Sequence, residues 1–230
     1  MRILRCSKPR LALAVGVTGH RSNRLAQDRR AAIADCIAFV IAAIAREAAG
    51  ARTRYRKYFS GRAPALTLVS ALAEGADTMA AKAALASRYE LDVILPFARK
   101  EYEKDFAPDD AKIYRRLCGK AHSIRELDGV RTDEAQAYEA AGLAMLDASH
   151  ILLAIWDGEP SAGRGGTVEI MNDAMARGIP VIQIDAQGLL SPKVVSREID
   201  AKPAVALEKS LAVLIDARIR EMHPGMSRDA

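Results

Sequence analysis

The chain has 230 residues, of which 50% are hydrophobic and 27% charged, which is typical of one globular domain with a sizeable core. Its three cysteines, Cys6, Cys36 and Cys118, lie far apart without a C-x-x-C spacing, so they indicate neither a disulfide framework nor a metal site and fit a cytoplasmic protein. The net charge of +5 is concentrated between residues 51 and 64, and no apolar run approaches the roughly 20 residues that span a bilayer, so we expect no membrane association.

The pattern along the chain predicts alternating strands and helices. The expected strands are residues 11–17, 66–70, 91–95, 123–127, 151–155 and 179–184. The expected helices are residues 25–49, 78–88, 133–148, 167–177 and 204–222, with short helices between 99 and 118 and a surface excursion over 187–203. Because the strands are apolar throughout rather than at every second position, they indicate a sheet buried on both faces. We therefore predict a single-domain α/β fold over residues 1–230, with a doubly wound, mostly parallel, Rossmann-like sheet.

The basic segment 51–64 lies between a predicted helix and a predicted strand. Its cations are interleaved with the aromatic residues Tyr55, Tyr58 and Phe59, and they are Arg52, Arg54, Arg56, Lys57 and Arg62. Such alternation can contact phosphates and stack on bases. Basic composition is only the first sign of a nucleic-acid-binding protein, so we favour a solvated or interface loop over a nucleic-acid site.

Three strand-to-helix junctions carry polar residues and glycines. The first, residues 16–21, contains Thr18, Gly19, His20 and Arg21. The second, residues 70–77, contains Glu74, Gly75 and Asp77. The third, residues 156–167, contains Trp156, Asp157, Gly163, Arg164, Gly165, Gly166 and Thr167. Ligands of parallel sheets bind outside the carboxyl ends of the strands, so we expect all three junctions to open onto one crevice.

The first and third junctions have the chemistry of an anion site. Glycines between 163 and 166 let the backbone approach a phosphate, toward which the first N–H groups of the following helix point. Arg21 can grip a phosphate with two hydrogen bonds, and His20 can bind a phosphate or a ribose hydroxyl, or make a structural hydrogen bond. Neither the G-x-G-x-x-G of dinucleotide folds nor the lysine of a P-loop is present, so we expect no cofactor beyond the ligand itself.

Four side chains have two readings each. Glu74 and Asp77 can stabilise the start of a helix, or accept hydrogen bonds from a ribose. Asp157 can serve a turn or a ligand hydroxyl. Trp156 can form a wall for a base, or be a large and partly buried side chain.

Five segments in this order resemble bacterial members of the SLOG superfamily: VGVTGHR, SALAEGADTMAA, LPFARKEYEKDF, AIWDGEPSAGRGGTVEI and GIPV. The resemblance covers residues 11 to 185 or so. It implies a Rossmann-like domain that binds nucleotides or nucleotide-derived ligands. The superfamily is similar to lonely-guy-type phosphoribohydrolases, to DNA-processing protein A and to the N-terminal region of melastatin-type TRP channels, and it contains both hydrolases and sensors.

The hydrolase branch carries a P-G-G-x-G-T-x-x-E loop whose glutamate contributes to cleavage of the N-glycosidic bond. When Thr167 is placed on the motif threonine, Ala162 and Arg164 replace the proline and the second glycine, and Ile170 stands in place of the glutamate. Glu169 precedes it by one residue, which on a helix is a rotation of about 100°.

We therefore expect binding or sensing of a phosphorylated ribonucleoside compound. The alternative is a nucleoside-monophosphate N-glycosidic hydrolase or ribosyltransferase in which Glu169 is catalytic. The resemblance further implies a homo-oligomer, at least a dimer, and an effector protein as a possible partner, while we expect neither nucleic acid nor a membrane to be one.

Overall fold

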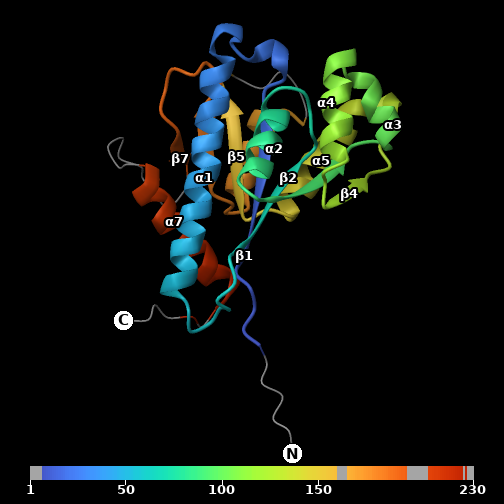
Figure 1. Ribbon diagram of the computed structural model, residues 1–230. Coiled ribbons are helices and arrows are strands. Elements are labelled where there is room, and N and C mark those ends of the chain that lie inside the picture. The colour runs from blue at the N-terminus through green and yellow to red at the C-terminus, as the bar shows by residue number, and fades with distance from the viewer. Residues whose placement is uncertain (1–6, 160–164, 196–206, 225, 227–230) are drawn as a thin grey trace, which may run out of the picture.

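The computed structural model describes residues 7–159, 165–195, 207–224 and 226 (Figure 1). Within these residues the chain forms one seven-stranded sheet in the order β4-β3-β2-β1-β5-β6-β7. The first six strands are parallel, and β7 runs antiparallel to β6. The strands are β1 Ala12–Gly19, β2 Ala65–Ser70, β3 Glu90–Leu95, β4 Ser123–Glu126, β5 Ile151–Trp156, β6 Val181–Asp185 and β7 Lys193–Val195.

Helices cover both faces of the sheet. The described α-helices are α1 Arg30–Arg54, α2 Ala76–Ala86, α3 Arg99–Tyr102, α4 Pro108–Cys118, α5 Glu134–Asp147, α6 Thr167–Ala176 and α7 Leu207–Met222. Short 3-10 turns occupy Ser22–Arg24, Gln27–Arg29, Glu103–Asp105 and Arg131–Asp133. Helix α1 packs between α2 and α7 on one face, and α5 packs on α6 on the other (Figure 1). None of the described helices is both long and apolar enough to cross a membrane.

Strand β5 explains why the strands are apolar at every position. Its Ile151, Leu153 and Ile155 belong to the larger core, which lies under α1, α2 and α7. Leu152 and Ala154, on the opposite face, belong to a second core with residues of α5 and α6. Both faces of the strand are thus removed from water, which confirms the predicted doubly wound α/β fold.

The basic segment 51–64 differs from the prediction of a loop. Helix α1 begins at Arg30, later than expected, and continues to Arg54, so the segment's first four residues are helical. Tyr55 and Phe59 are 0% and 3% exposed and belong to the larger core. The sequence left open that these two rings stack on nucleic-acid bases. This hypothesis is wrong, because both rings are buried in the core past the end of α1.

Two further boundaries differ from expectation. The predicted excursion 187–203 contains strand β7, whose Val194 pairs with Ile182 of β6. Three residues are too short for a periodic signal, and the pairing with β6 supplies the hydrogen bonds that define the strand. Helix α7 is described from Leu207, and the predicted start at 204 lies outside the described residues.

Candidate functional site

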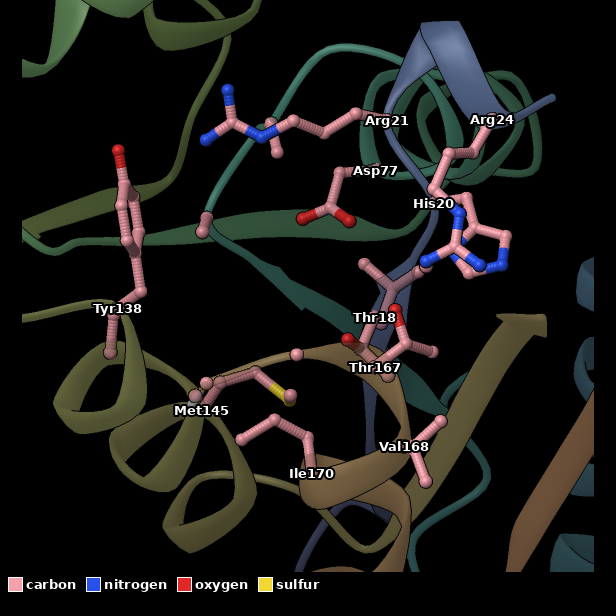
Figure 2. Close-up of a pocket in the computed structure, with 18 of the residues that line it drawn as sticks. Thr18, His20, Arg21, Arg24, Asp77, Tyr138, Met145, Thr167, Val168 and Ile170 are labelled. Carbon is pink, nitrogen blue, oxygen red and sulfur yellow. The ribbon is translucent and has the colours of Figure 1, made fainter. Parts of the chain in front are cut away.

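A cavity of about 440 Å³ opens at the carboxyl end of β1, and Figure 2 shows its lining. This is the point where the chain order along the sheet reverses, because β1 has β2 on one side and β5 on the other. In parallel sheets such a reversal separates the loops that follow the two strands and leaves room for a ligand. The cavity is bounded by the loops after β1 and β2, by the first residues of α6 and by one face of α5.

Four predicted residues of the first junction line this cavity: Thr18, Gly19, His20 and Arg21. Gly19 is required here, because a Cβ at this position would lie 2.5 Å from the Cβ of Ala76 and 3.0 Å from a backbone oxygen of β5. The close contact of β1 with α2 and β5 therefore fixes the direction in which the following side chains leave the strand.

Asp157 contacts the side chains of His20 and Arg24, and it does not line the cavity among the described residues. Its Oδ1 lies 2.8 Å from Nε2 of His20, and its Oδ2 accepts a hydrogen bond from Arg24 at 3.0 Å. Burial opposes the charge of Asp157, but the hydrogen bonds from His20 and from the N–H of Glu159, together with Arg24, hold its pKa below the ordinary value. With both oxygens engaged, Asp157 is placed to position His20 and Arg24, and its role as a hydroxyl acceptor stays a prediction.

Glu74 is the ion-pair partner of Arg21. The nearest oxygen of Glu74, Oε2, lies 3.4 Å from Nη1 of Arg21, and this buried oxygen has no hydrogen-bond partner among the described residues. Burial raises the pKa of Glu74, although the charge of Arg21 partly opposes the rise. The guanidinium of Arg21 also lies 5.6 Å from the centre of the Tyr138 ring. Arg21 is thus fixed at the rim by an acid and an aromatic ring.

Asp77 lies in the middle of the cavity lining (Figure 2). It is 5% exposed and accepts a hydrogen bond from Oγ of Ser70 at 2.8 Å. Burial raises its pKa to about 7, although hydrogen bonds from Ser70 and from the backbone of Ala71 and Ala73 oppose the rise. The carboxyl group therefore shapes the loop after β2 and is half protonated near neutral pH.

Gly75 joins the first two junctions to each other. Its φ is +98°, and a Cβ there would lie 2.6 Å from the carbonyl oxygen of His20 and 2.7 Å from the N atom of Ser22. The sequence placed Gly75 in a junction that was expected to open onto the ligand crevice. The structure shows that Gly75 closely approaches the loop after β1, and it is not among the described residues that line the cavity.

The third junction brings Gly165, Gly166 and Thr167 to the cavity. Gly165 has φ +75°, and its absent Cβ would meet the backbone N of Glu139 at 2.8 Å, so this loop packs closely on α5. Gly166 is the N-cap of α6, whose free N–H groups begin at Thr167. Gly163 and Arg164 lie outside the described residues.

Glu169 does not line the cavity among the described residues, whereas Ile170 does. Oε2 of Glu169 accepts a hydrogen bond of 2.6 Å from the N–H of Gly165, so the side chain closes the start of α6. The rotation of about 100° between successive helix residues agrees with this arrangement: the cavity receives the branched apolar side chain of Ile170 at the position of the motif carboxylate.

The wall formed by α5 was not found from the sequence. Tyr138, Gly142 and Met145 line the cavity from this helix. A Cβ at Gly142 would lie 2.3 Å from Cδ1 of Ile170, so the glycine allows α5 and α6 to approach. In an alanine-rich helical pattern these positions have no signal of their own, and only the packing of α5 on α6 turns them toward the site.

Two more polar contributions differ from expectation. Arg24, which the sequence analysis did not select, lines the cavity beside His20. Trp156 does not line it among the described residues, and its Nε1 donates to the carbonyl oxygen of Glu159 at 2.7 Å. No group of three or more His, Cys, Asp or Glu side chains suited to a metal ion occurs in the described part of the chain.

The sequence matches no protein-family model and no curated protein. Among solved structures, TM1055, a structural genomics target, is similar at 14% identity and a TM-score of 0.40, covering 74% of this chain and 72% of that protein. DNA processing protein A from Streptococcus pneumoniae is similar at 18% identity and a TM-score of 0.48, covering 91% of this chain. This chain spans 56% of the length of that protein.

Both TM-scores lie below 0.5, and the α/β fold follows from the strand order and register given above.

Proposed function

We propose that this Rossmann-like chain, which resembles the SLOG superfamily, binds a phosphorylated ribonucleoside compound without cleaving it. One observation carries the proposal: the cavity at the reversal point of the sheet combines the free N–H groups at the start of α6 with the cations of the loop after β1. Backbone N–H groups and the positive end of a helix dipole favour a phosphate. A volume of about 440 Å³ is within the usual range of small-molecule sites.

The phosphate end has donors in more than one form. Thr18 and Thr167 offer hydroxyls, and Arg24 offers a guanidinium that Asp157 keeps in place. Hydrogen bonds from charged donors to phosphate are about twice as strong as neutral ones, so Arg24 is the largest single contributor in this arrangement. Asp77, between the loops, is placed to accept a hydrogen bond from a ribose hydroxyl.

Binding without turnover is supported by what faces the ligand at the start of α6. A carboxylate near the glycosidic carbon would stabilise an oxocarbenium-like centre or activate water. Among the described residues, Ile170 lines the cavity at the motif position of the glutamate, and the carboxylate of Glu169 accepts a hydrogen bond from the N–H of Gly165.

The test is mass spectrometry of the small molecules released when the purified protein is heat-denatured, followed by incubation of the recovered compound with fresh protein. We expect an intact phosphorylated nucleoside that remains uncleaved. By titration calorimetry, Arg24→Ala should weaken its binding by roughly 10- to 100-fold, since charged hydrogen bonds contribute about 1.5–3 kcal/mol. Lys104→Ala, which removes a mostly exposed cation paired with Glu101, is the matched control and should change affinity less than twofold. Release of a free base and a ribose phosphate would contradict the proposal.

N-glycosidic hydrolysis remains the second candidate because of Asp77. A buried carboxyl group with a pKa of about 7 can donate a proton to a leaving base at neutral pH. If free base is released, Asp77→Asn should abolish the reaction while Glu169→Gln leaves most of it. The opposite pattern would identify Glu169 as the catalytic group and require its bond to Gly165 to break.

A further inference from the structure

The two ends of the cavity differ in chemistry. Figure 2 places His20, Arg24 and Thr167 at one end and Tyr138 at the other, with Asp77 between them. The first end consists of donors and cations around the start of α6. The second is formed by the ring of Tyr138 and by apolar side chains of α5 and α6. A ligand with one anionic and one aromatic end would match this arrangement.

Tyr138 is held rigidly while one part of it stays accessible. Its hydroxyl donates a hydrogen bond of 2.5 Å to Oδ2 of Asp105, and Arg131 is 2.7 Å from the other oxygen of that carboxylate. The rings of Phe97 and Tyr138 pack in a T-shaped arrangement, with 5.6 Å between centroids and 81° between planes. Tyr102, in the same aromatic cluster, also borders the cavity but is only 1% exposed, whereas Tyr138 is partly buried and offers more of its surface. Ordering this ring on binding therefore loses little conformational entropy.

Arg21 completes the aromatic end. Its guanidinium lies 5.6 Å from the centre of the Tyr138 ring and pairs with Glu74 at 3.4 Å. In Figure 2 the guanidinium extends toward Tyr138 and away from Thr167. Nucleic-acid bases stack on aromatic rings and on guanidinium planes, so both groups suit a base.

The apolar side chains beside Tyr138 add a second surface for a ring. Met145 and Ile170 line this part of the cavity. A Cβ at Gly142 would lie 2.3 Å from Ile170, so the glycine lets α5 and α6 approach closely beside these apolar side chains. A bare sugar phosphate would leave this surface in contact with water, whereas a base would bury it.

We infer that Tyr138 is the residue that recognises the aromatic base of the ligand, with Arg21 beside it, while the phosphate lies at the start of α6 near Arg24. This inference rests on the proposed function and deepens it, because it excludes a plain sugar phosphate as the preferred ligand. It also assigns Arg21, which the sequence analysis expected at the phosphate, to the opposite end of the cavity.

Titration calorimetry with two kinds of probe tests the inference. The probes are ribose 5-phosphate and the four nucleoside monophosphates AMP, GMP, CMP and UMP. We expect at least one nucleotide to bind more than tenfold tighter than ribose 5-phosphate. Tyr138→Ala should weaken that nucleotide by about 5- to 150-fold, the range of base stacking on an aromatic side chain, and change the affinity of ribose 5-phosphate less than twofold.

Two variants serve as controls for Tyr138→Ala. Tyr138→Phe keeps the ring and loses the hydroxyl, with its bond to Asp105 and its hydrogen-bond interaction with Arg21, so it should retain nucleotide affinity within about threefold if the ring is what recognises the base. Phe39→Ala removes an aromatic ring of α1 that is 48% exposed and does not line the cavity, and it should leave both affinities unchanged. Circular dichroism of each variant establishes that it is folded.

The outcomes separate this inference from the proposed function. If ribose 5-phosphate binds as tightly as every nucleotide, or if folded Tyr138→Ala loses affinity for both probes equally, the assignment of Tyr138 is wrong while phosphate binding stands. If neither kind of probe binds and no nucleotide is recovered from the purified protein, the proposed function itself fails. The comparison of probes on the wild-type protein decides the first case even if Tyr138→Ala does not fold.

Discussion

The cavity at the carboxyl edge of the sheet and the basic segment 51–64 at its amino edge both drew attention in the sequence, but they had different outcomes. In the cavity, residues from three junctions lie together as expected. In the segment, Tyr55 and Phe59 are core residues, and Arg52 donates to the carbonyl oxygen of Gly61 at 2.9 Å. The position of the three junctions after parallel strands thus correctly predicted that they lie together. Residue type alone did not predict which side chains of segment 51–64 are exposed.

The physical difference lies in what fixes each region. The carboxyl ends of parallel strands meet at one edge whatever their side chains are, so their loops must converge. The direction of a side chain past the end of α1 depends on where the chain turns, and here the turn brings Tyr55 and Phe59 into the larger core. The predictions that follow test this contrast, beginning with the largest expected effect.

Phe59→Ala tests whether the basic segment is part of the core. Removing a ring that is 3% exposed should lower the free energy of unfolding by about 3–5 kcal/mol, measured by urea denaturation. Tyr55→Phe is the matched control: within the described part of the chain the buried Tyr55 hydroxyl has no hydrogen-bond partner, so its removal should be neutral or slightly stabilising. If Phe59→Ala lowers the free energy of unfolding by less than about 1 kcal/mol, the segment is a surface loop, as the sequence led us to expect.

Gly75→Ala and Gly61→Ala compare one glycine from each region. Gly75 has φ +98°, and the Cβ of an alanine there would lie 2.6–2.8 Å from backbone atoms. The substitution should therefore lower the free energy of unfolding by roughly 2–4 kcal/mol. At Gly61 the Cβ of an alanine would meet no described atom within 4 Å, and the substitution should change the free energy of unfolding by less than about 0.5 kcal/mol. Equal effects of the two substitutions in thermal unfolding would contradict the tight junction between the first two loops.

Asp77 should make the stability of the cavity region depend on pH. Its pKa rises from 3.8 to about 7 on folding, so between these values the folded state binds more protons than the unfolded state. Stability should therefore fall as pH rises from about 4 to 7 and level off above it, with a slope of at most about 1.4 kcal/mol per pH unit from this group. In Asp77→Asn this contribution should disappear, while Glu208→Gln, which removes an exposed carboxylate of α7, should keep the slope. Parallel curves of stability against pH for wild type and Asp77→Asn would contradict the prediction.

Replacing the three exposed cations Arg56, Lys57 and Arg62 by glutamine should have the smallest effect. We expect the unfolding free energy to change by less than about 0.5 kcal/mol, because substitutions of solvated residues seldom change it more. In fluorescence anisotropy at physiological salt, neither wild type nor this variant should bind a labelled oligonucleotide. Binding by the wild type that falls steeply with salt and is lost in the variant would restore the nucleic-acid reading of the segment.

Most strands and helices could be predicted from the sequence because buried parallel strands leave continuous apolar runs. The site was predicted less completely. Thr18, His20 and Asp77 were found because they follow strands, and they do line the cavity. Tyr138 and Arg24 were missed, because the first sits within an alanine-rich helix and the second in a 3-10 turn, where neither the spacing nor the residue type indicates a ligand.

Two assignments needed the loop geometry itself. The role of Asp157 as a hydroxyl acceptor stays a prediction, and the sequence did not indicate that its carboxylate lies 2.8 Å from His20 and 3.0 Å from Arg24. Nor did the sequence indicate that Gly75 closely approaches the loop after β1. In both cases the partner comes from a junction distant in sequence, and a local pattern contains no information about it.

The sequence by itself determined the α/β class, the edge at which the three junctions meet and the replacement of the motif glutamate by Ile170. These follow from local periodicity, from the common direction of parallel strands and from the fixed rotation per helix residue. The tertiary structure alone decided that Tyr138 faces the cavity, that Arg21 lies with Glu74 at 3.4 Å and that Phe59 is buried. These depend on contacts between elements far apart in the chain, which only the packed fold brings together.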